Sequence, residues 1–142
     1  MTGEKPRVFL DSNIWFSAFY GSVNCEKLLK AHIDHKITAV ISTRVLEEIV
    51  RNIKEKIPKL IPVFNLFISS YPPLIIANPK SIPKKILKYV ESEDQPIFAA
   101  AINAGVKFFV TGNIGDFQTE KLEKLTQIKI LTPAQAVKEL RL

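Results

Sequence analysis

This chain of 142 residues contains one cysteine, one tryptophan and one methionine, and it has no long uncharged apolar run. Because Cys25 has no second cysteine to pair with, the sequence predicts a reducing compartment, and we expect a cytoplasmic location. We expect Cys25 itself to be a small buried apolar residue. No apolar stretch reaches the roughly 18 residues that a membrane span needs, so we expect no membrane partner. The segment from Met1 to Pro6 is polar and lacks the apolar core of a signal peptide.

Size and charge set the frame for what the chain does contain. With 142 residues, 46% of them hydrophobic, it fits one globular domain over residues 1–142 with a sizeable core. Its formal net charge of +6 favours a polyanionic partner such as nucleic acid. A solvated surface that is simply rich in lysine is an equally good interpretation, so charge alone does not decide between them.

Short apolar runs alternate with segments of helical spacing along the whole chain. Strands are predicted at Val8–Leu10, Lys36–Ile41, Leu74–Ile76, Lys107–Val110 and Lys129–Leu131. Helices are predicted over residues 24–35, after a cap at Ser42 or Thr43, over 58–68, 83–89, 92–104 and 119–125, and after Thr132–Pro133. This alternation predicts an α/β fold with a mostly parallel sheet covered on both faces.

Acidic residues follow or precede the predicted strands. Asp11 closes the first apolar run, and Asp116 follows the run that ends at Val110. Asp94 lies at the start of the helix before that second strand. A parallel sheet brings such positions to one edge, where α/β folds place their ligand crevices. We therefore expect these carboxylates to converge, and a hard cation would bind between them.

Each acidic residue also has an ordinary structural interpretation. Asp11 is typical of a turn or a helix cap, and so are Ser12 and Asn13 beside it. Ser92 and Gln95 match a capping box, which would place Asp94 in an acidic first turn favoured by the helix dipole. Asp116 could simply begin the next segment.

The helix after Ser42 carries two adjacent glutamates and two arginines. Glu47 and Glu48 fall on the polar side of the helical wheel, which alone predicts ordinary surface residues. Basic side chains near an acidic cleft would be needed to contact nucleic acid, and the candidates are Arg44, Arg51 and Lys107.

The aromatic residues, the histidines and the cysteine give weaker indications of function than the acidic residues do. Trp15, Phe16, Phe19 and Tyr20 could stack on bases, but we expect them mainly in the core or at an interface. His32 and His35 are expected to be solvated and to have no functional role. With two histidines and one cysteine in the chain, we do not expect a zinc site.

Taken together, four segments resemble the PIN domain family. They are Val8–Asn13, Glu48 on its helix, Asp94 with Ala99–Ala101, and Val110–Asn113 with Asp116–Phe117. The resemblance covers about Arg7 to Glu139. It is closest to the small VapC-like proteins, which are toxin components of toxin–antitoxin pairs.

The resemblance implies a three-layer α/β/α sandwich and a Mg²⁺- or Mn²⁺-dependent endoribonuclease of the hydrolase class. It also implies an RNA substrate, an antitoxin protein as partner and a homodimer. By position it implies catalytic roles for Asp11, Glu48, Asp94 and Asp116, of which Asp11, Asp94 and Asp116 would bind the metal. Ser12, Thr111 and Asn113 would support the site.

One departure from the family pattern opens an alternative. Many relatives have an aspartate where this chain has Asn113, directly after Thr-Gly, and an amide adds no charge. Asp116 could supply the missing carboxylate; if it does not, the chain could be a non-catalytic RNA-binding or scaffold module. A metal-dependent phosphatase with an Asp-x-Asp nucleophile is disfavoured, because Asn13 occupies the second acidic position.

Overall fold

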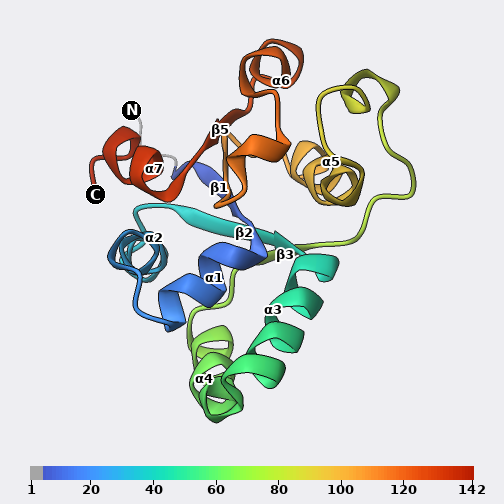
Figure 1. The fold of residues 1–142 in the computed structure, drawn as a ribbon. Helices are drawn as coiled ribbons and strands as arrows, with labels where there is room; N and C mark the ends of the chain where they lie inside the picture. Colours follow the sequence, from blue (N-terminus) through green and yellow to red (C-terminus); the bar gives the residue numbers. More distant parts are fainter. Residues whose placement is uncertain (1–4) are drawn as a thin grey trace.

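Five parallel strands form the central sheet of this computed structural model, which describes residues 5–142 (Figure 1). Their order across the sheet is β3-β2-β1-β4-β5. The polar start of the chain, for which we expected no signal peptide, lies largely outside the described residues. The strands are β1 (Arg7–Leu10), β2 (Thr38–Ser42), β3 (Leu74–Ile76), β4 (Phe108–Val110) and β5 (Lys129–Leu131).

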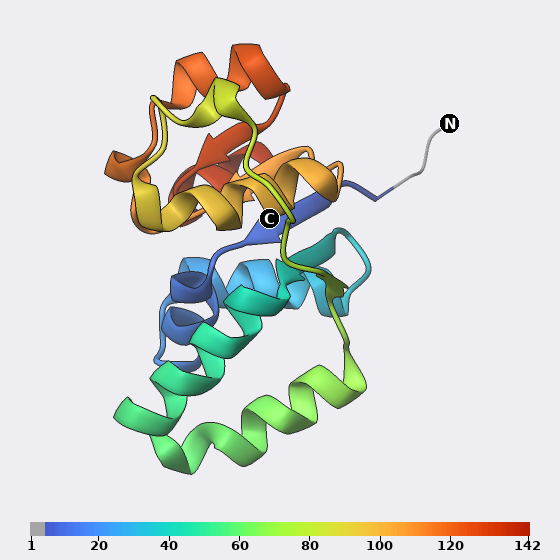
Figure 2. The ribbon, with the colours of Figure 1, turned by 90° about the vertical axis from the view of Figure 1, so that its right-hand side faces the viewer.

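Helices cover both faces of the sheet, as Figures 1 and 2 show. One side holds α1 (Ser12–Phe19), α2 (Val23–Ile33), α3 (Thr43–Lys56) and α4 (Ile61–Ser70), with α7 (Pro133–Glu139) packed beside α2. The other side holds α5 (Gln95–Asn103) and α6 (Thr119–Thr126). The predicted three-layer α/β/α sandwich with a parallel sheet is confirmed.

Local sequence signals explain several helix ends. The Ser42 side chain accepts a hydrogen bond from the Val45 N–H and caps α3. Thr132 and Gln135 form a complete capping box at the start of α7. Gly105, which follows α5, has a φ of +64°, a left-handed conformation that glycine adopts without strain. These ends lie where the sequence predicted them.

The helix predicted over residues 83–89 is wrong. The structure has only a 3₁₀ turn over Lys84–Ile86. Tertiary contacts use the backbone groups that a longer helix would need. The Gln95 side-chain amide donates to the carbonyls of Leu87 and Val90, and Val90 forms an antiparallel bridge with Phe117.

The capping box predicted for Ser92 and Gln95 is also absent, because the Gln95 side chain makes those contacts instead. Residues Ser92–Asp94 form a 3₁₀ turn, and α5 begins one residue after Asp94. Asp94 is therefore the residue at the junction of the two elements, and its side chain makes no capping hydrogen bond.

The strand order creates a switch point between β1 and β4. From β1 the chain builds the sheet outward through β2 and β3, then returns to add β4 and β5 on the other side. The paired residues Leu10 and Val110 end these two neighbouring strands at the same level. Parallel α/β sheets bind ligands in the crevice at such a point, beyond the carboxyl ends of the strands.

The polar side chains buried in the described chain gather at this edge. They are Asp11, Ser42 and Thr111, and each follows or ends one of the three central strands. Burying polar groups costs free energy unless they are hydrogen-bonded. Their common location therefore distinguishes this edge from the rest of the core, which is apolar.

Three expectations about single residues have clear outcomes. Cys25 is buried, as predicted. His32 is not simply solvated, because its Nδ1 accepts the Ala39 N–H and its Nε2 lies 3.1 Å from the Tyr71 carbonyl oxygen. It ties α2 to β2 and to the end of α4. His35 is exposed, as expected.

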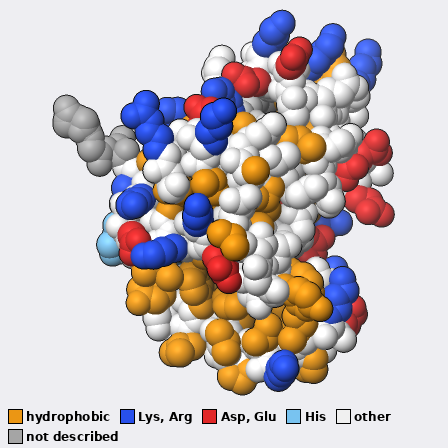
Figure 3. All heavy atoms as spheres, turned by 60° about the vertical axis from the view of Figure 1, so that its left-hand side comes forward, with side chains coloured by type: hydrophobic (Ala, Val, Ile, Leu, Met, Phe, Trp, Pro, Cys, Tyr) orange, Lys and Arg blue, Asp and Glu red, His pale blue; other side chains and the backbone are white. Residues whose placement is uncertain are grey.

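Exposed hydrophobic side chains gather on one part of the surface, over α1, α2 and α4 (Figure 3). Tyr20, Val23, Val63 and Leu66 are each at least half exposed there. Within residues 5–142, no helix is both long enough and apolar enough to cross a membrane.

Close packing of α5 against the sheet leads to a first prediction. Ala100 is fully buried on α5, which contacts β2. Replacing Ala100 with leucine forces a larger side chain into a filled core and should cost about 1–3 kcal/mol of unfolding free energy. Ala134→Leu, at an exposed position on α7, is the matched control and should change little. Urea unfolding of both variants measures the difference; equal stabilities would contradict this packing.

Candidate active site

A cavity of about 230 Å³ opens at the switch point between β1 and β4. Its wall combines the segments that follow both strands, the first three turns of α3 and the start of α5. Acidic, amide and basic side chains dominate its surface. The lining residues are Asp11, Ser12, Asn13, Arg44, Glu48, Arg51, Asn52, Glu93, Asp94, Ile97 and Asn113.

Asp11 lies at the base of this cavity and is 3% exposed. Its Oδ1 accepts the Ser12 N–H at 2.8 Å, and its Oδ2 accepts the Thr111 hydroxyl at 2.9 Å. Burial raises the pKa of Asp11, the two hydrogen bonds lower it, and the charges of Glu48 and Asp116 raise it. The pKa is raised on balance, so a proton is held more tightly here than in water.

The loop after β4 is fixed by a chain of hydrogen bonds. The Thr111 hydroxyl, which donates to Asp11, accepts the N–H of Asn113 at 3.1 Å. The Asn13 side chain accepts the N–H of Gly112 at 2.9 Å. A Cβ at Gly112 would meet the Asn13 Oδ1 at 3.2 Å, so glycine allows this close approach. The loop is thus held to the first turn of α1.

Glu48 reaches the same cavity from α3. Its side chain is 23% exposed, and its Oε2 lies 3.9 Å from the Nε of Arg44, one turn earlier. Its charge acts on both Asp11 and Asp94. Glu47 is exposed and does not line this cavity. The helical wheel alone assigned both glutamates to the surface, and for Glu48 this was wrong because α3 crosses the end of β1.

Asp94 and Asp116 form the second part of the acidic group. Asp94 lines the cavity, while Asp116 comes from the 3₁₀ turn Ile114–Asp116 and faces the adjoining hollow beside Val90 and Gln95. The pKa of Asp94 is raised to about 7, first by burial and then by a side-chain hydrogen bond with Asp116. The charges of Asp11, Asp116 and Glu48 raise it further. These four carboxyl groups therefore interact electrostatically.

The donor atoms are of the chemical type that a hard divalent cation prefers, although their spacing in this structure is too wide for three of them to bind one ion. All four side chains offer carboxylate oxygens, which Mg²⁺ and Mn²⁺ prefer. Burial is the largest cause of the raised pKa of Asp94, and the charges of Asp11, Asp116 and Glu48 add to it; a cation would relieve this repulsion between carboxylates. Among the residues that the structure describes, no three His, Cys, Asp or Glu side chains are grouped closely enough to hold a metal ion together.

The predicted basic contacts divide into two kinds. Arg44 and Arg51 line the cavity beside Glu48. Lys107 does not, because it precedes β4 and so lies at the amino-terminal edge of the sheet, with its ammonium group over the Phe108 ring. The expectation that Lys107 contacts a substrate at this site is wrong.

The predicted aromatic residues do not line the cavity. Trp15 is fully buried, donates to the Leu10 carbonyl and packs edge-on against Phe64. Phe19 also packs against Phe64, while Phe16 stacks on the exposed Tyr20 near the far end of α1. The expected core role is confirmed for Trp15, an interface role for the exposed Tyr20 stays a prediction, and base stacking at this cavity is not supported.

Sequence reasoning missed the structural importance of Asn13 and Gly112. It treated Asn13 as an ordinary cap or turn residue, whereas Asn13 joins two loops that are 99 residues apart in the chain. The available signal was that both residues closely follow strands predicted to belong to one parallel sheet, whose carboxyl ends share an edge.

Comparison with known proteins agrees with this architecture. The family model described as PIN domain matches residues 7–115, so the chain belongs to the PIN domain family. PIN domains are generally nucleases. The matched range includes Asp11, Glu48 and Asp94 and ends one residue before Asp116. No curated protein matches the chain.

The Thr111–Asp11 hydrogen bond generates a stability prediction. Thr111→Val keeps the shape of the side chain but removes a donor from a buried carboxyl group, which should cost about 1–3 kcal/mol. Thr43→Val is the matched control, because Thr43 is exposed and its hydroxyl makes only a 3.5 Å contact with Ile76. Denaturant unfolding should show a lower unfolding free energy for Thr111→Val alone. An equal loss of unfolding free energy in both variants would contradict a special role for Thr111.

The raised pKa of Asp94 generates a pH prediction for the protein in chelator. With a folded pKa of about 7 against 3.8 when unfolded, the folded state binds the extra proton across this window. Stability should therefore fall as pH rises from about 4 to about 7. Asp94→Asn cannot ionise, so it should gain stability relative to wild type as pH rises. Melting temperatures across this range measure the gain, and Asp34→Asn, which removes an exposed carboxylate from the end of α2, is the control. A constant difference between Asp94→Asn and wild type would contradict the shift.

Proposed function

We propose that this protein is a metal-dependent endoribonuclease that hydrolyses RNA phosphodiester bonds. One observation carries the proposal: Asp11, Glu48 and Asp94 line the switch-point cavity, Asp116 interacts with Asp94 from the adjoining hollow, and the pKa of Asp94 is raised to about 7. Clustered acids with raised pKa values are typical of functional sites. Membership of the PIN domain family supports the same class of reaction.

The four acids have different places in the proposed reaction. Asp11 is the fixed member, because Ser12 and Thr111 orient both of its oxygens. Asp94, whose pKa is raised to about 7 by burial and then by a hydrogen bond with Asp116, can hold a proton near neutral pH. Glu48 adds charge from the opposite wall. Asp11, Asp94 and Asp116 are the proposed ligands of Mg²⁺ or Mn²⁺, while Ser12, Thr111 and Asn113 support them.

The cation would supply what these side chains lack. When bound, a divalent ion of this type polarises a phosphoryl oxygen and lowers the pKa of a bound water. The protein's own contribution is to hold the carboxylates in a partly water-excluded cavity and to restrict the strand that enters it. The excess negative charge of the cluster supports a cation at this position.

The toxin role, the antitoxin partner and the homodimer stay predictions based on the resemblance to VapC-like proteins, as does the cytoplasmic location. The apolar surface over α1, α2 and α4 is compatible with a protein partner. It does not distinguish an antitoxin from a second copy of the chain.

The alternative is a PIN-like module that binds RNA without cleaving it, and Asn113 is the residue that favours it. Asn113 is exposed at the rim of the cavity and adds no charge. Calorimetric titration with Mn²⁺ separates the two proposals. A catalytic site should bind the ion and lose binding in Asp94→Asn, whereas a module without a site should show no heat of binding.

The catalytic proposal predicts metal-dependent cleavage. A mixed pool of structured RNA should be cut by wild type in Mn²⁺ or Mg²⁺ and left intact in chelator. Asp94→Asn should lower the cleavage rate by at least about 100-fold, since it removes a ligand and an ionisable group from the cluster. Asp34→Asn should cut like wild type. Gel analysis of the products measures all three proteins; cleavage that persists in Asp94→Asn would contradict the assignment.

A further inference from the structure

The acidic cavity continues into a second hollow of about 370 Å³ along α3. Arg44, Glu48 and Arg51 line both of them. The far wall of the second hollow comes from Asn78 and Pro79 in the loop after β3, and from Pro96 at the start of α5. The two hollows therefore form one groove, and the three α3 side chains are its shared wall.

The spacing of these three residues places them in a row. Glu48 is four residues after Arg44, and Arg51 is three residues after Glu48, so all three lie on the same face of α3. At 1.5 Å per residue, the two arginines are roughly 10 Å apart along the helix axis. The Glu48 carboxylate therefore lies between the positive charges of Arg44 and Arg51 along the helix.

Both arginines are available to an incoming anion. Arg44 is exposed, and its 3.9 Å contact with Glu48 is a surface pair of the kind that contributes little stability. The backbone N–H of Arg44 donates to the Asn78 side chain at 2.9 Å, which fixes the loop against α3 without using the guanidinium group. Arg51 is exposed and forms no ion pair with any residue in the described part of the chain.

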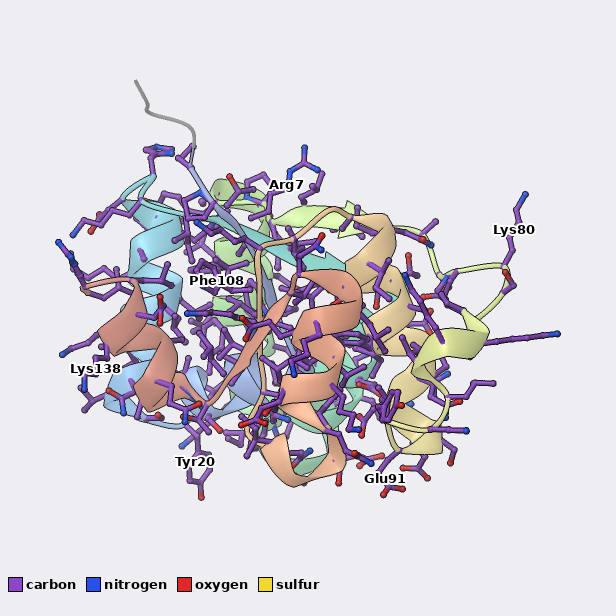
Figure 4. The ribbon with its side chains drawn as sticks, turned by 90° about the horizontal axis from the view of Figure 1, so that it is seen from above. Arg7, Tyr20, Lys80, Glu91, Phe108 and Lys138 are labelled. Atoms are coloured by element: carbon purple, nitrogen blue, oxygen red, sulfur yellow. The ribbon has the colours of Figure 1, made fainter. Side chains whose placement is uncertain are left out.

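A nucleic-acid strand needs such charges beside an acidic cluster. The phosphate that would enter the cavity is an anion, and four carboxyl groups repel it. Arg44 and Arg51 are the basic residues that line the acidic cavity. At physiological salt, charge interactions are screened over about 8 Å, so charges in the cavity wall offset this repulsion most effectively. Lys80, two residues after Asn78, points away from the body of the molecule (Figure 4).

We propose that Arg44 and Arg51 bind phosphates of one nucleic-acid strand on either side of the phosphate presented to the acidic cluster. The groove would thus recognise the phosphodiester backbone through two guanidinium forks, which suit phosphate geometry. This inference rests on the proposed function, and it assigns substrate binding to two residues outside the four acids.

The experiment measures binding without cleavage. The probe is a fluorescein-labelled single-stranded RNA of about 12 nucleotides of mixed sequence, a length within the range that one binding domain covers. Fluorescence anisotropy is recorded with the full chain in chelator and in calcium, a hard cation with the same preference for oxygen donors. The test variant is Arg44→Gln/Arg51→Gln.

The matched control is Lys107→Gln/Lys138→Gln, which removes the same charge from exposed residues that line neither hollow. Figure 4 shows Lys138 on α7, on the opposite side of the molecule from Glu91, which precedes Asp94. Arg44→Lys/Arg51→Lys restores the charge without the planar fork. Melting temperatures of all variants show whether each remains folded.

The expected result is a smaller salt dependence. Each lost phosphate contact should reduce the slope of log binding constant against log salt by about 0.7, so the glutamine pair should lose about 1.4. Extrapolated from about 1 M to about 0.15 M salt, this is roughly tenfold weaker binding. The control Lys107→Gln/Lys138→Gln should change this slope by much less. Arg44→Lys/Arg51→Lys should recover most of the slope that the glutamine pair loses.

Two results would overturn the inference: equal losses in the test and control variants, or no RNA binding by wild type in either condition. Failure of the proposed function looks different. If wild type binds through these arginines but never cuts RNA in Mn²⁺ or Mg²⁺, the phosphate site stands and the nuclease does not. If wild type cuts and the glutamine pair binds and cuts equally well, only the present inference fails.

Discussion

The buried carboxyl group of Asp11 is the constraint on which the rest of the site depends. A carboxylate in a protein interior is costly unless it is hydrogen-bonded. Here the donors are the N–H of Ser12, the next residue, and the hydroxyl of Thr111, 100 residues after Asp11. Both donors are available only if α1 begins directly after β1 and β4 ends level with it. The hydrogen bonds of the Asp11 side chain therefore depend on both the register of β1 with β4 and the start of α1.

The same arrangement makes the cavity electrostatically unfavourable without a counter-charge. Burial and the neighbouring acids raise the pKa values of Asp11 and Asp94. A protein selected for stability alone would place apolar or neutral residues at this edge, as it does elsewhere in the core. Local arrangements that lower the stability of a fold are typical of functional sites. Membership of the PIN domain family indicates the class of reaction for this site, because PIN domains are generally nucleases.

Much of the fold could be predicted from the sequence, because the signals are local or follow from topology. The β-branched and apolar runs gave the strands, and Ser42, Thr132 and Gly105 marked helix ends. Convergence of Asp11 and Thr111 followed from the rule that parallel strands end at a common edge. The helix predicted over residues 83–89 is absent, and Gln95 instead binds the carbonyl groups of Leu87 and, just beyond this range, Val90, a tertiary contact that no local pattern reveals.

In the candidate site, too, some features could be predicted from sequence and topology, and others depend on tertiary packing. Glu48 looked like a surface residue on the helical wheel, and only the crossing of α3 over the strand ends brings it to Asp11. Lys107 is a different kind of error, because the information was present in the sequence. A residue that precedes a parallel strand lies at the opposite edge from the residues that follow it, so Lys107 and Asp116 could not share one cleft wall.

The chain's departure at Asn113 can be understood in the same physical terms. Its backbone N–H is bound by the Thr111 hydroxyl, and its side chain is at the cavity rim, so an amide there leaves the centre of the cluster unchanged. The 3₁₀ turn that follows brings Asp116 back into hydrogen-bonding reach of Asp94. The carboxylate that position 113 does not supply is thus placed three residues later, beside Asp94, whose pKa is raised to about 7. This geometry favours Asp116 as the fourth acid and weakens the argument for a site that has lost its function.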